Sequence, residues 1–321
     1  MKKELATKVK ERLRAIYADS QKEEKAFRLL SEKLSVYEED SSGGEVFSER
    51  DSILITYGDT IVDGAECGLR VLSKFLKEFV RDSIGNVHLL PMYPYTSDDG
   101  FSVTDYRQIN PELGSWEDVE NLSAEYGLMF DAVINHISKS SDWFQGYLKG
   151  ESPYRDYFIT CDPKADYSAV TRPRALPLLT EFETSEGVKH VWTTFSEDQI
   201  DLNYGCPELL AQIADLLLMY AQKGARYIRL DAVGFMWKEL GTTCMHLPQT
   251  HEIIKLIKDI FRVYSPKTWI ITETNVPHED NISYFGTDGD EADLVYQFPL
   301  PPLVMYSLIT GSAKTLSDWM K

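Results

Sequence analysis

Cysteine is scarce in this chain, and its few copies are not spaced as metal ligands or disulfide partners. Among 321 residues only Cys67, Cys161, Cys206 and Cys244 occur, and none of them belongs to a CxxC pair. This pattern argues against a disulfide framework and against a zinc site. We expect the four side chains to be small buried hydrophobes in a reducing compartment.

Long apolar runs and an excess of basic residues are also missing. No stretch approaches the roughly 20 apolar residues of a membrane-spanning helix, and the basic N-terminus lacks the continuous apolar centre of a signal peptide. With 33 Lys and Arg against 51 Asp and Glu, the formal net charge is −18. Because phosphate binding requires a basic surface, nucleic acid and anionic membranes are disfavoured as partners. We therefore expect a cytoplasmic protein.

The remaining composition is that of a globular protein, with 43% hydrophobic and 26% charged residues. In residues 4–34 apolar side chains recur at helical spacing, which predicts a helix. The polar stretch 38–50 contains Gly43 and Gly44 and predicts a linker. Residues 1–50 are thus expected to form a helical extension and a linker ahead of the main domain.

From residue 51 onwards, short apolar strands alternate with amphipathic helices. Strands are predicted at 52–56, 87–90, 128–134, 227–230, 269–272 and 294–296, and helices at 68–81, from 115, at 207–222 and at 249–264. Short apolar strands are typical of a parallel sheet that is buried on both faces, so the pattern predicts an α/β fold of repeated βα units.

One connection is far longer than the others. The third predicted strand and its helix are separated by much more than the roughly 2–6 residues that usually join such elements. We expect residues 137–200 to form an inserted domain within a catalytic domain that spans residues 51–321.

Charged side chains follow three successive predicted strands. Asp131-Ala-Val-Ile-Asn135-His136 follows the third, Arg229-Leu-Asp231 the fourth, and Glu273 the fifth. Taken singly, each has an ordinary structural explanation: a chance match, an ion pair or a helix cap. Their order favours function, because the active groups of βα barrels lie at the carboxyl ends of the strands.

The spacing of these residues predicts a pair of carboxylates. Asp231 and Glu273 end adjacent parallel strands, which lie about 4.8 Å apart, so their carboxyl groups are expected at the separation of about 5 Å used by retaining glycosidases. One then acts as an ionised nucleophile and the other, with a raised pKa, as general acid and base. Arg229 faces the same side as Asp231 and is expected to lower the pKa of that carboxyl group.

Together these motifs resemble the α-amylase superfamily, glycoside hydrolase family 13, and above all its sucrose-phosphorylase branch. The resemblance runs from about residue 51 to the end of the chain. Further motifs that carry it are Leu90-Pro-Met-Tyr-Pro-Tyr95, Asp98-Asp-Gly-Phe101, Leu113-Gly-Ser-Trp116, Arg172-Pro-Arg174, Gln199-Ile-Asp-Leu-Asn203 and Ile271-Thr-Glu273. The helical extension, Ile55-Thr-Tyr-Gly-Asp59 and the segment 172–179 are similar to the glucosylglycerate phosphorylases of this branch.

The resemblance implies a reaction and three of its residues. Asp231 is the expected nucleophile, Glu273 the expected acid/base, and Arg229 the arginine that steadies the nucleophile. Inorganic phosphate would be a co-substrate, no other cofactor is implied, and the product would be α-glucose 1-phosphate from glucosylglycerate or sucrose. Hydrolysis or transglucosylation by the same site is the alternative.

Further residues are expected around the sugar. Asp98 and His136 would grip the glucosyl hydroxyls, Phe101 would form an aromatic platform, and Arg174 would handle phosphate or the acceptor. The alternative for His136 is a metal ligand, which is disfavoured because no second His or Cys stands at ligand spacing. Asn135 lies where some amylases anchor calcium, but this branch usually lacks that ion, so we expect no metal.

The resemblance also implies a (β/α)8 TIM barrel, of which the chain supplies about six of eight strands. The family's third acidic residue, an Asp preceded by His after the seventh strand, has no counterpart here. Six parallel strands would leave two apolar edges exposed, which predicts a marginal, oligomeric or aggregation-prone protein unless another chain supplies the rest, and a homodimer is the oligomer that we consider. The chain is then either an incomplete enzyme or an inactive remnant, and on its own we expect phosphorolysis near background.

Overall fold

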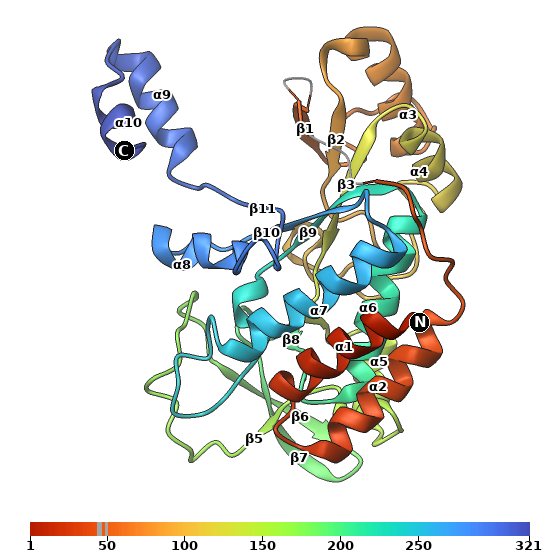
Figure 1. Cartoon of the computed structure of the whole chain (residues 1–321), viewed down its shortest axis with the longest axis vertical. Coiled ribbons are helices and arrows are strands. Elements are labelled where there is room, and N and C mark those ends of the chain that lie inside the picture. Colours follow the sequence, from red (N-terminus) through yellow and green to blue (C-terminus); the bar gives the residue numbers. More distant parts are fainter. Residues whose placement is uncertain (44–46, 49–50) are drawn as a thin grey trace.

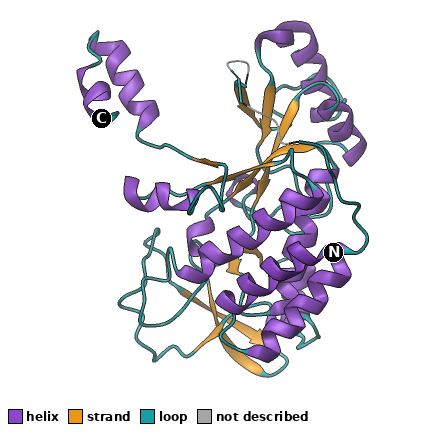
Figure 2. Ribbon diagram, viewed as in Figure 1, coloured by secondary structure: helices purple, strands orange, loops and turns teal. Residues whose placement is uncertain are grey.

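A six-stranded parallel sheet forms the centre of the computed structural model, which describes residues 1–43, 47–48 and 51–321. In spatial order the strands are β1 (Ile53–Thr56), β2 (Asn86–Leu89), β3 (Gly127–Ala132), β9 (Ala225–Leu230), β10 (Trp269–Thr272) and β11 (Leu294–Val295). All neighbouring pairs are parallel. The six predicted strands and their alternation with helices are confirmed, and the sheet curls into part of a barrel (Figure 1, Figure 2).

Helices cover the outer face of this sheet. They are α3 (Gly68–Phe75), α4 (Trp116–Ser123), α6 (Pro207–Gln222) and α7 (Pro248–Tyr264). A capping box between Ser115 and Asp118 begins α4. The helix predicted at 68–81 is α-helical only as far as Phe75 and then continues as a π turn and a 3-10 turn.

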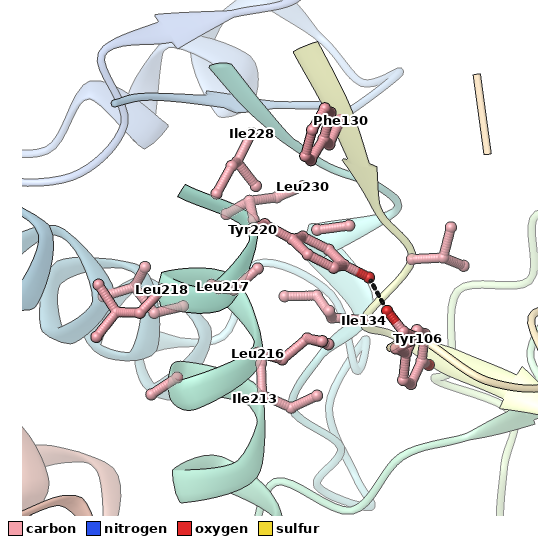
Figure 3. Packing of buried hydrophobic residues seen from close by; sticks show 14 of the residues in the cluster. Tyr106, Phe130, Ile134, Ile213, Leu216, Leu217, Leu218, Tyr220, Ile228 and Leu230 are labelled. Carbon is pink, nitrogen blue, oxygen red and sulfur yellow. Dashed lines mark hydrogen bonds between the residues drawn. The ribbon is translucent and has the colours of Figure 1, made fainter. Parts of the chain in front are cut away.

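The core lies between α6 and strands β3 and β9. Figure 3 shows Phe130 of β3 and Leu230 of β9 beside Leu217 and Tyr220 of the helix, all of them buried. Most side chains of α6 are buried around its whole circumference, not along one stripe. A second layer must therefore cover the other side of α6, and the N-terminal extension provides it.

The extension is a helical hairpin, so the prediction of one helix over residues 4–34 was wrong. α1 (Lys3–Ile16) and α2 (Ser20–Leu34) are separated by a turn at residues 17–19. Asp19 caps α2 by accepting hydrogen bonds from the amides of Gln21 and Lys22. The hairpin packs α1 on α7 and α2 on α6 (Figure 1).

The predicted linker is described only in part, because residues 44–46 and 49–50 lie outside the described residues. Within it, the ring of Phe47 lies 4.2 Å from that of Trp269 and 6.1 Å from that of Tyr227, measured between centroids. Both partners stand in the first half of their strands. The linker thus places an aromatic side chain at the amino ends of β9 and β10.

The segment between β3 and α6 folds as an insertion. Antiparallel strands β4 (His136–Ser138) and β8 (Gln199–Asp201) join its two ends. Between them lie α5 (Asp142–Leu148) and an antiparallel sheet of β5 (Thr160–Cys161), β7 (Gly187–Trp192) and β6 (Leu179–Thr184). Because β4 follows β3 directly, this pairing fixes His136 beside the carboxyl end of the main sheet.

The last part of the chain is the least packed. After α8 (His278–Ile282) and β11, helices α9 (Leu300–Thr310) and α10 (Lys314–Trp319) contain no buried residue and project away from the other elements (Figure 1). Among the described residues, no helix has the length and apolar character needed to cross a membrane.

Candidate active site

The carboxyl ends of β3, β9 and β10 bring the predicted acidic residues together. Asp131 is in register with Arg229, and Leu230 with Thr272, so Asp231 and Glu273 follow paired residues side by side. The ladder continues past the strands, because the Asp231 amide donates to the Ala132 carbonyl and the Glu273 amide to the Leu230 carbonyl, both at 3.1 Å. This is the arrangement that the strand pattern predicted.

Arg229 is the common cation of three carboxylates. Its Nη1 donates to Asp231 Oδ1 at 2.8 Å and also to Asp131 Oδ1, and its Nη2 lies 4.0 Å from Glu273 Oε2. Burial works to lower the pKa of Arg229, but the three negative charges outweigh it and raise that pKa. The guanidinium also faces the ring of Tyr296, 5.4 Å from its centroid.

Asp131 is an inner carboxylate that does not line the site. It is buried and accepts from Arg229, while its other oxygen lies 2.8 Å from His88 Nε2. Burial works to raise the pKa of Asp131, but the charges and hydrogen bonds of Arg229 and His88 lower it overall. Asp131 therefore stays ionised and takes a share of the charge of Arg229.

For Asp231 the expected direction of the pKa was wrong. Burial raises the pKa of this carboxyl most strongly, Glu273 and Asp131 raise it further, and only Arg229 opposes them, which leaves a pKa of about 7. The side chain is 11% exposed. The prediction from the Arg229–Asp231 pair failed because Arg229 is shared with other carboxylates and because burial penalises the charged form.

Asp98 and His136 meet through Gln199. The amide nitrogen of Gln199 donates to Asp98 Oδ2 at 2.8 Å and lies 3.2 Å from His136 Nε2. His136 Nε2 is in turn 2.9 Å from the carbonyl oxygen of Phe101, to which it can donate. Burial lowers the pKa of His136, so its ring is neutral at pH 7. A carboxylate and an imidazole thus converge as fixed hydrogen-bonding groups.

An unusual turn presents Asp98. Asp98, Asp99 and Gly100 have φ values of +55°, +49° and +102° in succession. A Cβ at Gly100 would lie 2.9 Å from Pro91 Cβ and 3.0 Å from its carbonyl oxygen, so this position requires glycine. Backbone strain of this kind is common where a functional side chain must be aimed.

A cavity of about 340 Å³ is lined by six of the seven predicted site residues. The six are Asp98, Phe101, His136, Arg174, Asp231 and Glu273. Arg229 is not among its lining residues; its side chain is 11% exposed and bonds to Asp231. Sequence reasoning gave no role to the other lining residues, Tyr57, Asp99, Phe195, Gln199 and Ala232. For Gln199 a signal was present, since it opens one of the family motifs.

A second cavity of about 600 Å³ adjoins the first. The two share Arg174, Phe195, Ala232 and Glu273. The second is lined in addition by residues of the insertion and of the segments that follow β9 and β10, namely Thr171, Pro173, Gly234, Phe235, Met245, Thr274, Asn275, Val276 and Pro277. Glu273 Oε2 is oriented by the amide of Ala232 at 3.1 Å. Glu273 therefore stands at the boundary between two compartments, and Arg174 is a cation open to both.

A buried lysine lies where the sequence raised the question of calcium. Lys238 Nζ is 2.6 Å from Asp201 Oδ2 and donates to Asn135 Oδ1 at 3.0 Å, and the side chains of Lys238 and Asp201 are 4% and 0% exposed. The ammonium group of Lys238 thus lies between the side-chain oxygens of Asp201 and Asn135, where a bound calcium ion would otherwise find its ligands. Across residues 1–43, 47–48 and 51–321, no group of three or more His, Cys, Asp or Glu side chains is placed to hold a metal ion.

The fold and this site define a class of protein. The family described as "Alpha amylase, catalytic domain" matches residues 71–317, and the chain belongs to it. Both the predicted family and the barrel-type fold are confirmed.

Particular relatives are phosphorylases. A glucosylglycerate phosphorylase of Allomeiothermus silvanus is 54% identical over 273 residues, which are 85% of this chain and 49% of the relative. A sucrose phosphorylase of Streptococcus mutans is 32% identical over 84% of this chain and 56% of its own length. The crystal structure of sucrose 6F-phosphate phosphorylase from Thermoanaerobacter thermosaccharolyticum matches with a TM-score of 0.75 and 28% identity, covering 85% of this chain and 57% of that chain. The chain spans about half the length of the curated relatives it matches.

Proposed function

We propose that the site belongs to a retaining α-glucosyl phosphorylase that releases α-glucose 1-phosphate. The observation that carries the proposal is the convergence of Asp231, Glu273, Asp98 and His136 on one cavity at the carboxyl ends of the strands. Glucosylglycerate is the proposed donor, because relatives with 50–54% identity bear that name while the sucrose phosphorylases are 30–32% identical.

In the first step, ionised Asp231 attacks the anomeric carbon and forms a covalent glucosyl ester. The glycosidic C–O bond breaks, and Glu273 gives its proton to the departing glycerate oxygen. Asp98 and His136 would hold the sugar hydroxyls, because neutral sugars are recognised by directional hydrogen bonds. Arg229 would balance the charge of Asp231 in the free site.

In the second step, an oxygen of inorganic phosphate attacks the same carbon. Glu273 now accepts the proton of the attacking phosphate, the ester bond to Asp231 breaks, and the carboxylate is regenerated. Two inversions give net retention. The position of Glu273 between the two cavities suits this exchange of roles, since the leaving group departs and phosphate arrives on its side.

Arg174 is the proposed anion-binding residue. Both the carboxylate of glycerate and phosphate require a cation near the reacting oxygen, and the Arg174 side chain lines both cavities. Arg174→Ala should raise KM for phosphate and, at saturating phosphate, should raise KM for glucosylglycerate more than KM for neutral sucrose. Equal losses for charged and neutral donors would argue against this role.

The two carboxylate roles can be separated with an activated donor. 5-Fluoro-α-glucosyl fluoride needs no acid for departure of fluoride, so the protein and its Glu273→Gln variant should both acquire a glucosyl adduct on Asp231, located by peptide mass spectrometry. Asp231→Asn should acquire none. An adduct on another residue would overturn the assignment of the nucleophile.

The reaction class is tested by product analysis. The 321-residue chain, and any longer product of its gene, should be incubated with glucosylglycerate or sucrose in the presence and absence of phosphate. We expect phosphate-dependent release of the α-anomer of glucose 1-phosphate by a longer product, and phosphorolysis near background by the 321-residue chain alone. Free glucose at the same rate without phosphate would instead identify a hydrolase.

A further inference from the structure

The turn of the N-terminal hairpin packs against the main domain through Tyr17. Tyr17, which follows α1 directly, is 3% exposed, and its hydroxyl donates to the carbonyl of Tyr204 at 3.1 Å. Its ring meets Trp237 edge-on, with centroids 6.4 Å apart. Burial raises the pKa of Tyr17, so the hydroxyl remains a neutral donor. Tyr17 thus connects the extension to two segments that lead to the sugar site.

The first connection is a series of hydrogen bonds to the chain after β3. The carbonyl oxygens of residues 134–136 each accept one: from the hydroxyl of Tyr204 at 2.7 Å, from the amide of Leu202 at 2.9 Å and from the hydroxyl of Tyr106 at 2.6 Å. Tyr106 is itself held, because its carbonyl accepts from Tyr220 (Figure 3). The backbone that presents His136 is therefore held by hydrogen bonds at three consecutive carbonyl groups. Tyr204 holds the first of these, that of Ile134, and Tyr17 in turn holds the backbone of Tyr204.

The second connection runs through side chains. Trp237, against which Tyr17 packs, precedes Lys238, whose ammonium donates to Asn135 Oδ1 at 3.0 Å. Asn135 Nδ2 lies 3.3 Å from His136 Nδ1 and can donate to it. This contact leaves Nε2 of His136 as the protonated nitrogen, which matches its contact with the Phe101 carbonyl. Both connections from Tyr17 end at His136.

We propose that Tyr17 is a positioning residue for His136 and that the helical hairpin is part of the support of the sugar site. This inference rests on the proposed function, because His136 is assigned there to the glucosyl hydroxyls. Loss of the Tyr17 hydroxyl leaves the buried carbonyl of Tyr204 without that donor and loosens the hydrogen bond from Tyr204 to residue 134. Misplacement of a binding group by even about 1 Å is enough to weaken its contacts with substrate.

The test compares two hydroxyl deletions in the same extension. Tyr17→Phe keeps the ring and removes the donor. Tyr37→Phe is the matched control, because the Tyr37 hydroxyl also bonds to the main domain, donating to Asp215 on α6. Val9→Ala, at a fully buried position of α1, is a second control that weakens packing of the hairpin without touching either connection.

Two measurements distinguish positioning from general stability. Amide hydrogen exchange in a peptide spanning residues 128–138 should be faster in Tyr17→Phe, and the dissociation constant for glucose should rise about three- to tenfold, the effect of one hydrogen bond. Both should stay close to the wild-type values in the controls. Tyr204→Phe should reproduce the effect, and the double variant should add little. Exchange in this peptide that is the same in Tyr17→Phe and Tyr37→Phe would overturn the proposal.

Failure of the proposed function would leave a different signature. Exchange of residues 128–138 is measured without any substrate, so it decides the positioning role even if the protein neither binds glucose nor makes glucose 1-phosphate. If exchange and glucose affinity respond to Tyr17→Phe while a longer product of the gene shows no phosphorolysis, the proposed reaction is wrong and the positioning role stands.

Discussion

At the scale of single residues, the site is governed by the sharing of one cation among several carboxylates. Arg229 forms ion pairs with Asp131 and Asp231 and lies 4.0 Å from Glu273, so its positive charge is shared among three carboxylates. Asp131, which is also bonded to His88, stays ionised, and Asp231 carries a pKa of about 7. Ionising this buried carboxyl at neutral pH lowers the stability of the fold. The proposed chemistry nevertheless depends on it, because Asp231 is the proposed nucleophile.

Asp231→Asn should therefore stabilise the protein while it abolishes turnover. The pKa of Asp231 in the fold, about 7, lies above the ordinary value of about 3.9, so the native state retains a proton that the unfolded chain has released. Stability is then lost as the pH rises from about 4 to 7. The variant should gain on the order of 1 kcal/mol in the free energy of unfolding at pH 8 and nothing at pH 4.

Denaturant unfolding at the two pH values measures this difference. Asp98→Asn is the control, since Asp98 is exposed and its neutralisation should leave stability nearly unchanged. A destabilised Asp231→Asn at pH 8 would show that Asp231 is held as a favourable ion pair after all.

Asp131→Asn should move the pH dependence of the first chemical step. The negative charge of Asp131 is one cause of the raised pKa of Asp231, and its removal also leaves Arg229 Nη1 bonded to Asp231 without competition from the Asp131 carboxylate. We expect the acid limb of kcat/KM, measured with α-glucosyl fluoride so that phosphate does not titrate, to shift to lower pH. An acid limb that stays at the same pH, or that shifts to higher pH, would show that the charge of Asp131 does not raise the pKa of Asp231.

At the scale of elements, the junction between the barrel and its insertion depends on a buried ion pair. Lys238→Met should lower the free energy of unfolding by about 3–5 kcal/mol, because Asp201 would be left as an uncompensated buried charge. Adding Asp201→Asn should recover part of the loss. Lys139→Met, which breaks an exposed pair with Glu197, should cost less than about 1 kcal/mol.

Chemical denaturation of the single and double variants tests this junction. Equal losses for Lys238→Met and Lys139→Met would mean that the buried pair contributes no more than a surface pair.

The elements also show what could be predicted from the sequence. Strand order and side-chain alternation were enough to place Asp231 beside Glu273, because both depend on local periodicity and on the register of neighbouring parallel strands. The break at Tyr17 was missed because apolar spacing continues through it; the signal was Asp19 before Ser20, a capping pattern inside a helical stretch. Contacts between distant segments, such as Lys238 with Asn135 and Phe47 with Trp269, depend on tertiary packing and leave no local pattern.

The pKa of Asp231 was unpredictable for a related reason. Proximity to Arg229 is visible in the sequence, but depth of burial and competition from Asp131 are properties of the assembled site. Arg174 could be assigned from its motif, whereas its place between two cavities required the fold of the insertion. Tyr57 lies within the quoted motif Ile55-Thr-Tyr-Gly-Asp59, whereas Phe195 carried no signal that separates a pocket wall from a core residue.

At the scale of the whole molecule, an apolar surface on α9 stands out. Leu308 and Ile309 are 73% and 78% exposed, and Met305 and Tyr306 on the same helix are more than half exposed. Exposed apolar side chains gathered on one helix favour association. We expect the 321-residue chain to self-associate as its concentration rises, and Leu308→Lys with Ile309→Lys to reduce association without changing the melting temperature.

Sedimentation velocity over a range of concentrations measures this association. Undiminished self-association of the double variant would place the contact elsewhere, for example at the edge strands β1 and β11. The expected homodimer remains a prediction until that measurement.

The buried ammonium of Lys238 has a consequence for the conditions in which the protein can work. A bound ion stabilises a fold by mass action, so its contribution shrinks when the free ion is diluted or sequestered. A charge that is part of the polypeptide has no such concentration dependence and cannot be removed by a chelator. For a protein whose proposed co-substrate is phosphate, which itself binds calcium, a covalently tethered cation keeps the insertion in place regardless of how much phosphate the reaction requires.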